Sequence, residues 1–204
     1  MIQLSNMEKG KRLYSVLESY HILYDGMRTI KYSIKAKKEG GITPQFTERI
    51  MLAVTEVNDC PACSFVHTKM ALETGMDSEE IQNMLSGAFD SIPKEELPAV
   101  MFAQHYADSK GHPSKASWEE VITQYGESKA LAILGTIRMI MMGNVYGIVL
   151  GSFVNRFKGK SDSRSTIFYE VLMMISALIF IPVVFIHVLS ASLLHIPIIS
   201  FEEK

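Results

Sequence analysis

The sequence predicts an all-α fold that ends in a long hydrophobic helix, and three observations support this. Apolar residues recur with helical spacing along most of the 204 residues, and no stretch shows the strict alternation typical of a strand. Helix-starting pairs such as Thr43-Pro44 and Asp77-Ser78 stand before these apolar runs. From Val171 to Leu194 the chain has no formal charge, which sets the last helix apart.

The first predicted helix includes the apolar period from Leu13 to Tyr24. A basic stretch follows it, formed by Arg28, Lys31, Lys35, Lys37 and Lys38. These charges are spread around the helix, so we expect a solvated helix end there rather than an anion site.

Two helices are predicted on either side of Asn58-Asp59. The first begins at Thr43-Pro44 and carries an apolar run. The second is expected to be capped by Asp59, to have Pro61 in its first turn and to end at Gly75. Its apolar residues are Phe65, Val66, Met70 and Leu72.

Four more helices are predicted before the hydrophobic tail. Asp77 to Glu80 indicates a capping box that opens a short helix to about Gly87. The next helix is expected from Glu95 to about Ser109, and another starts at Ser117. A long apolar helix follows, from Glu127 to Phe157.

Glycines recur every four residues in this long helix, at Gly143, Gly147 and Gly151. They clear a strip of one helix face, so that another backbone can approach it closely. Glycine costs about 1 kcal/mol relative to alanine in a helix interior, so tight packing is expected to compensate. That packing lies either within one protomer or at a subunit contact, and both remain open.

The two cysteines of the chain, Cys60 and Cys63, are three residues apart. At a helix N-terminus they face unpaired N–H groups and the positive end of the helix dipole. This environment lowers the pKa of a thiol from about 8.5 toward neutrality, and only the thiolate is nucleophilic. The pair therefore predicts reversible dithiol chemistry. Half of an intermolecular zinc site, or two inert buried thiols, are the plainer alternatives.

His67 and Glu48 are the candidate partners of this pair. Cys60, Cys63 and His67 follow the spacing i, i+3 and i+7, so they share one helix face and His67 is a direct neighbour of Cys63. An imidazole at that place can exchange a proton with the thiol. Glu48 lies on the preceding helix, which would have to fold back for the carboxylate to orient the ring. Glu56 is expected to face solvent.

The stretch from Glu48 through Cys60-Pro61-Ala62-Cys63 to His67 resembles the signature of the alkylhydroperoxidase D-like (AhpD-like) branch of the carboxymuconolactone decarboxylase family. Residues 1–158 are similar to this family in pattern. The resemblance implies an AhpD-like helical bundle that forms a homo-oligomer, a trimer or hexamer, and reduces a peroxide substrate without metal or other cofactor. It implies Glu48 and His67 as a proton relay and Cys63 as the thiol that attacks peroxide. Cys60 is then the resolving thiol, facing a reducing partner of lipoyl or thioredoxin type.

One position departs from this branch, whose best-studied peroxidases have a histidine between the two cysteines. This chain has Ala62 there. A thiol–disulfide exchange module without significant peroxidase activity therefore remains an alternative. A cofactor-free lyase, in which Glu48 and His67 do acid and base chemistry, is another, although decarboxylase members generally lack the cysteine pair.

Composition and the absence of known motifs exclude several classes of function. The net charge of −2 gives no indication of nucleic-acid binding, and no phosphate loop, dinucleotide fingerprint or zinc-protease motif is present. Met1 to Leu13 is polar, which predicts that no cleaved secretion signal is present. We expect the domain in the cytoplasm, where thiols are kept reduced and a dithiol is more often catalytic than structural.

The composition changes sharply after residue 158. A polar linker at 159–166 is predicted to precede a hydrophobic helix at 167–195 and a tail at 196–204. About 20 apolar residues suffice to cross a bilayer core. Basic residues lie just before this helix, so the positive-inside rule predicts a cytoplasmic domain anchored to the cell membrane by a single C-terminal helix, with Glu202-Glu203-Lys204 outside. The alternative is a swapped arm docked on a neighbouring subunit.

Overall fold

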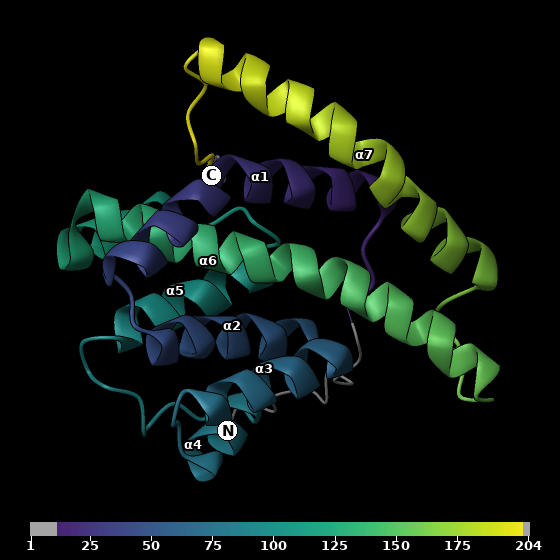
Figure 1. Cartoon of the computed structure of the whole chain (residues 1–204), viewed down its shortest axis with the longest axis horizontal. Coiled ribbons are helices and arrows are strands. Elements are labelled where there is room, and N and C mark those ends of the chain that lie inside the picture. Colours follow the sequence, from purple (N-terminus) through teal and green to yellow (C-terminus); the bar gives the residue numbers. More distant parts are fainter. Residues whose placement is uncertain (1–11, 202–204) are drawn as a thin grey trace, which may run out of the picture.

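The computed structural model describes residues 12–201, and every regular element in that range is a helix (Figure 1). This confirms the all-helical prediction for the described part of the chain. The helices are α1 (Val16–Glu39), α2 (Pro44–Asn58), α3 (Pro61–Glu73), α4 (Ser78–Leu85), α5 (Leu97–Asp108), α6 (Lys115–Phe157) and α7 (Ile167–Leu193).

Helix α6 runs through the middle of the molecule (Figure 1). Helix α1 packs along one side of it, and α2, α3 and α5 pack against it from the other side. Helix α4 contacts α2 and α3, while α7 lies over α1 and also touches α6. The helices that carry the predicted site, α2 and α3, are therefore on the opposite side of α6 from α7.

Side-chain caps explain several helix starts. Thr43 accepts a hydrogen bond from the first turn of α2, as predicted, and Ser114 does the same for α6. Asp77 caps α4 through the backbone N–H of Glu79. Glu80 does not complete the predicted capping box; its carboxylate instead accepts hydrogen bonds from Arg49.

Helix α6 contains one non-helical residue, Gly126, with φ of 74° and ψ of 158°. Glycine adopts this conformation at little steric cost because it has no Cβ. The two helices predicted from Ser117 and Glu127 are thus joined at Gly126 into one kinked element. That element begins slightly earlier than expected, at Lys115.

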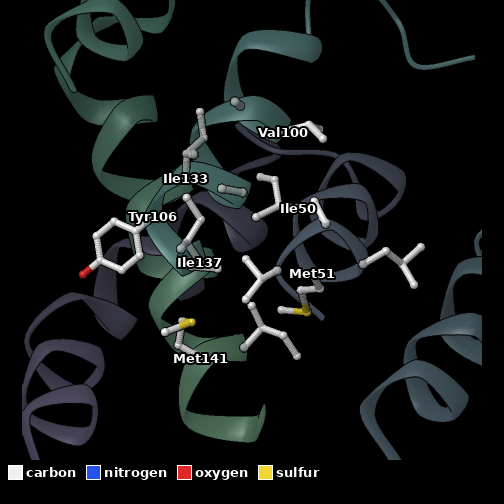
Figure 2. Close-up of a cluster of buried hydrophobic side chains, with 14 of the residues drawn as sticks. Ile50, Met51, Val100, Tyr106, Ile133, Ile137 and Met141 are labelled. Carbon is white, nitrogen blue, oxygen red and sulfur yellow. The ribbon is translucent and has the colours of Figure 1, made fainter. Parts of the chain in front are cut away.

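The hydrophobic core lies between α6 and the pair α2 and α5 (Figure 2). Ile50 of α2, Val100 of α5, and Ile133 and Ile137 of α6 have no exposed surface. Burying a large apolar side chain contributes about 1.5–3 kcal/mol, so this cluster holds α2 and α5 against α6. It thereby also sets where α2 can present Glu48.

No side chain separates α1 from α6 where these helices are closest. A Cβ atom added to Gly135 would lie 2.6 Å from the backbone carbonyl oxygen of Thr29, closer than such atoms can approach. Nearby, the hydroxyl groups of Ser33 and Thr136 form a hydrogen bond of 2.9 Å. Small residues on both helices therefore permit backbone-to-backbone packing.

Arg28 corrects the expectation that the whole basic stretch is solvated. It is buried, and its guanidinium donates to the carbonyl oxygens of Ile196 at 2.5 Å and Pro197 at 2.7 Å. Arg28 thereby attaches the segment after α7 to α1. Lys31 and Lys35, in contrast, are exposed as predicted.

Helix α7 is long and apolar enough to cross a membrane, which confirms the predicted C-terminal hydrophobic helix. Helix α6 passes the same test of length and composition, but most of its apolar stretch is buried inside the protein, whereas most of α7 is not. The predicted outer end at Glu202-Glu203-Lys204 lies outside the described residues, as do residues 1–11 of the polar N-terminal segment.

The substitution Gly135→Ala should destabilise the fold, because the added methyl group meets the backbone of α1 rather than a side chain that can rotate away. We expect a loss of about 3 kcal/mol in the free energy of unfolding, at the upper end for overpacking. Denaturant unfolding followed by circular dichroism measures it.

Gly143→Ala on the same helix is the control, because the nearest atom to its new Cβ is 3.8 Å away. This substitution should not lower the free energy of unfolding, and it can raise it by up to about 1 kcal/mol because alanine has a higher helix propensity than glycine. Equal stability of the two variants would contradict the close approach of α1 to α6.

Candidate active site

The two cysteines lie at the N-terminus of α3 and are joined by a disulfide, with Cα atoms 5.3 Å apart. The cap is Cys60 and not the predicted Asp59, which ends α2 in the left-handed conformation with φ of 48°. The Sγ atom of Cys60 accepts a hydrogen bond of 3.3 Å from the backbone N–H of Cys63. Pro61 occupies the first turn, as predicted. The helix N-terminus therefore donates directly to a sulfur atom of the pair.

Helix α6 covers the disulfide. Cys60 has no exposed surface and Cys63 is 8% exposed. A Cβ atom added to Gly147 would lie 2.9 Å from Sγ of Cys63 and 3.1 Å from Sγ of Cys60, so glycine leaves room for both sulfur atoms. Of the three regularly spaced glycines, Gly147 is therefore used within the protomer. A Cβ on Gly143 or Gly151 would meet no tight neighbour among the described residues.

This burial corrects one implication of the family resemblance. Cys60 was expected to face a reducing partner, but it is enclosed by α6 and by the first turn of α3, which it caps. Cys63 is the member of the pair with some exposed surface. A partner thiol that approaches this disulfide in the described protomer reaches Cys63 first.

Glu48 and His67 meet as the spacing predicts, because α2 and α3 fold back against each other. Oε2 of Glu48 lies 2.8 Å from Nδ1 of His67, within hydrogen-bond distance. Glu48 is almost fully buried on α2, and the His67 side chain is 13% exposed. His67 lies one turn after Cys63 on α3. With Nδ1 held by the carboxylate, Nε2 is the nitrogen left to exchange a proton.

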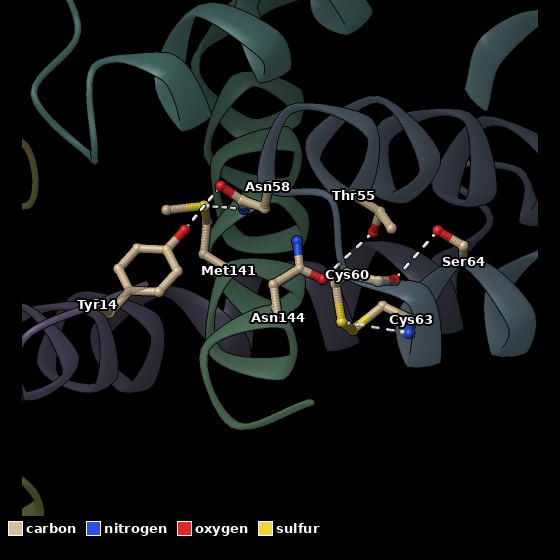
Figure 3. The surroundings of a disulfide bond; sticks show 8 residues. All are labelled: Tyr14, Thr55, Asn58, Cys60, Cys63, Ser64, Met141 and Asn144. Carbon is tan, nitrogen blue, oxygen red and sulfur yellow. Dashed lines mark hydrogen bonds between the residues drawn. A yellow bond between two sulfur atoms is a disulfide. The ribbon is translucent and has the colours of Figure 1, made fainter. Parts of the chain in front are cut away.

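Two buried asparagines near the disulfide were not identified from the sequence (Figure 3). Asn144 accepts a hydrogen bond of 3.3 Å from Thr55, and its Nδ2 has no hydrogen-bond partner within residues 12–201. Asn58 accepts a bond of 2.7 Å from the hydroxyl of Tyr14. Burial raises the pKa of Tyr14 to about 12, so this hydroxyl stays protonated and can donate. A lone asparagine in the apolar run of α6 is the signal that could have revealed Asn144.

Arg49, next to Glu48 in sequence, braces the helix that carries the carboxylate. Its guanidinium pairs with Glu80 of α4 at 2.5 Å and with Glu96, just before α5, at 2.8 Å. Burial outweighs this pairing and raises the pKa of Glu96. The ion pairs tie α2 to both neighbouring segments and so help to fix the position of Glu48.

The sequence model of the carboxymuconolactone decarboxylase family matches residues 23–92. This segment contains α2 and α3, and with them Glu48, Cys60, Cys63 and His67; it ends before α5. The AhpD-like branch lies within that family, so the predicted resemblance is confirmed for the family over this segment. The chain matches no curated protein and no solved structure.

The substitution Gly147→Ala should disturb the disulfide, because its methyl group would lie within contact distance of both sulfur atoms. We expect a loss of about 1–3 kcal/mol in the free energy of unfolding of the oxidised protein. Denaturant unfolding measures the loss, and equilibration in glutathione buffers shows whether the dithiol–disulfide equilibrium moves with it.

Gly151→Ala, one helical turn later, is the matched control because nothing lies within 4 Å of its new Cβ. It should leave both the stability and the redox equilibrium of the protomer unchanged or slightly improved. Wild-type behaviour of Gly147→Ala in both measurements would show that the sulfur atoms do not rest against α6.

Proposed function

We propose that this chain, whose residues 23–92 match the carboxymuconolactone decarboxylase family, is a peroxidase that reduces peroxides through a dithiol–disulfide cycle of Cys60 and Cys63. The observation that carries the proposal is the disulfide at the N-terminus of α3, with the Glu48–His67 hydrogen bond one helical turn away. A helix N-terminus stabilises a thiolate, and a histidine held by a carboxylate can transfer protons to and from it.

In the proposed cycle the thiolate of Cys63 attacks one oxygen of a peroxide. An S–O bond forms while the O–O bond breaks, and the departing oxygen takes a proton and leaves as an alcohol or water. Cys63 is then a sulfenic acid. Cys60 attacks its sulfur atom, water leaves and the disulfide forms. A dithiol donor supplies two electrons and two protons to restore both thiols.

His67 is the group that we assign to the proton transfers. Nδ1 is bound to Glu48, so Nε2 takes the proton of the Cys63 thiol and later returns one to the leaving oxygen. Glu48 acts on the ring, holding its orientation and stabilising it when it carries a charge. Because α2 and α3 already bring the two side chains together, the relay needs no substrate to assemble.

The reducing partner that we propose is a lipoyl or thioredoxin-type dithiol, which attacks Cys63 and releases Cys60. Next to this position, α3 exposes Phe65, Val66 and Met70. These residues were expected to supply the apolar face of α3, and their exposure suits a contact with another copy. A homo-oligomer, a trimer or hexamer, is therefore part of the proposal. Cytoplasmic placement would keep the thiols reduced between turnovers.

Thiol–disulfide exchange without significant peroxidase activity is the second candidate function. Ala62, in the first turn of α3, stands where the best-studied peroxidases of the branch have a second histidine. The relay then consists of Glu48 and His67 alone. The disulfide, its helix N-terminus and the exposed edge of Cys63 serve exchange equally well.

The substitution Cys63→Ser should reduce peroxide consumption to the uncatalysed rate, because a hydroxyl cannot replace the thiolate. Cys60→Ser should still react once and accumulate a sulfenic acid on Cys63. Peroxide consumption with a lipoyl or thioredoxin-type donor, together with mass spectrometry after sulfenic-acid trapping, measures both results.

Full turnover by Cys63→Ser would rule out the proposed cycle. If the wild type consumes no peroxide although a dithiol donor rapidly reduces its disulfide, exchange is the function. Enzymatic activity that survives the loss of both cysteines would instead favour the cofactor-free lyase.

The substitution Glu48→Gln should slow peroxide reduction by roughly tenfold to a hundredfold, since the amide no longer supports a charged imidazole. The rate should also lose part of its pH dependence. Glu56→Gln on the same helix is the control, because Glu56 bonds with Gln104 and is not a member of the proposed relay. Equal rates for these two variants would contradict the role of Glu48.

A further inference from the structure

Helix α7 has one packed face and one bare face. Glu170, Met173, Ser176, Val184 and Ala191 form the packed face and are buried. The bare face carries large apolar side chains, among them Phe168, Ile175, Leu178, Phe185, Ile186 and Leu193. No Asp, Glu, Lys or Arg lies between Val171 and Leu194. A helix of 27 residues is about 40 Å long, so this face is far larger than the apolar patches of ordinary soluble monomers.

The packed face is attached to α1, and to Tyr14 just before α1, at successive points. Near the start of α7, the Tyr169 hydroxyl donates to the carbonyl oxygen of Tyr14 at 2.7 Å. Further along, Nδ1 of His187 lies 3.0 Å from the Tyr20 hydroxyl, and its ring stacks on Tyr24 with centroids 4.2 Å apart. Helix α7 therefore lies along α1 and does not project away from the domain (Figure 1).

The segment after α7 is attached as well. Arg28 of α1 donates to the carbonyl oxygens of Ile196 and Pro197, and Arg138 of α6 donates to that of Ile198 at 2.9 Å. Both arginines are buried. These bonds hold the segment after α7 against α1 and α6.

The neighbours of α7 are incompatible with a bilayer core. Helix α1, which packs along α7, carries Glu18, Asp25, Arg28 and Lys31. If α7 crossed the hydrocarbon in its docked position, it would take these charged groups with it, at a high cost for each. If α7 crossed without α1, it would lose its contacts with Tyr20 and Tyr24, and the segment after it would lose its bonds with Arg28. The attached helix can therefore meet a membrane only by lying flat on it.

We propose that α7 is an in-plane membrane anchor, whose bare face enters one leaflet while its other face stays on α1. The partner is a bilayer that contains anionic lipid. Exposed Lys158 and Lys160 lie before the start of α7, and exposed Lys31 lies one turn beyond Arg28, near its other end. Apolar burial combined with flanking basic residues is the pattern of helices bound at anionic membrane surfaces.

A second copy is the competing occupant of this face, and the same charges disfavour it. In a two-fold pair with antiparallel α7 helices, Lys158 and Lys160 of one copy approach Lys31 of the other. In a parallel pair, each lysine approaches its own equivalent. Both arrangements bring like charges together, whereas anionic headgroups neutralise them. The inference does not depend on the proposed peroxidase activity.

An in-plane anchor makes a distinct prediction about topology. Residues after α7 stay on the same side of the membrane as the domain, whereas a spanning helix places them on the opposite side. The full chain with Cys60→Ser, Cys63→Ser and Ser200→Cys has a single thiol, at residue 200. Its labelling shows on which side of the membrane that residue lies. After dilution from detergent onto preformed vesicles of phosphatidylcholine and phosphatidylglycerol, a membrane-impermeant maleimide should label it from outside.

Flotation of the wild-type chain with the same vesicles tests the surface. We expect Leu178→Glu, on the bare face, to weaken vesicle binding by at least about tenfold, and vesicles of phosphatidylcholine alone to bind less protein. Met101→Glu, at an exposed residue of α5, is the control and should bind like the wild type.

Three outcomes would overturn the inference. Labelling of Ser200→Cys only after detergent is added would show a spanning helix. A wild-type chain that stays out of the floating fraction as a discrete oligomer would show that a second copy covers α7. Unchanged binding by a folded Leu178→Glu variant would show that another surface holds the membrane.

Discussion

Close approach to the backbone of α6 is the constraint on which the other features of the structure depend. At Gly135 the carbonyl oxygen of Thr29 lies where a side chain would begin. At Gly147 the sulfur atoms of Cys60 and Cys63 lie there. An added methyl group at either position costs more than the helix propensity it gains. The apolar core between α2, α5 and α6 supplies the free energy that holds these contacts together.

The same contact governs access to the cysteine pair. Helix α6 covers Cys60, while Cys63 retains a small exposed edge, so the two sulfur atoms differ in their access to solvent. In the dithiol state the sulfur atoms are no longer bonded and need more space than a disulfide does. Because little space separates Gly147 from the two sulfur atoms, the first turn of α3 and the adjoining part of α6 are the segments closest to any change on reduction. Asn144, whose Nδ2 has no hydrogen-bond partner within residues 12–201, lies near the disulfide (Figure 3).

Helix α1 lies between α6, whose opposite side covers the disulfide, and the apolar helix α7. It packs against α6 at Gly135, contacts α7 through Tyr20 and Tyr24, and holds the segment after α7 through Arg28. A bilayer bound by α7 would therefore lie on the other side of α6 from the disulfide. The exposed edge of Cys63 and the exposed apolar residues of α3 lie on the side of α6 away from α7.

By itself, the sequence determined the helical class, most helix boundaries, the placement of the cysteines at a helix N-terminus and the pairing of Glu48 with His67. The first three follow from local spacing, because residues three or four apart share a helix face. The pairing of Glu48 with His67 was predicted from the family signature and also required α3 to fold back against α2. Only the tertiary structure decided that Gly147 contacts the disulfide, that Cys60 is the enclosed thiol and that Arg28 is buried. Those facts depend on which helices pack together and how closely. No local pattern contains that information, since a glycine strip, a cysteine pair and a basic stretch each suit several partners.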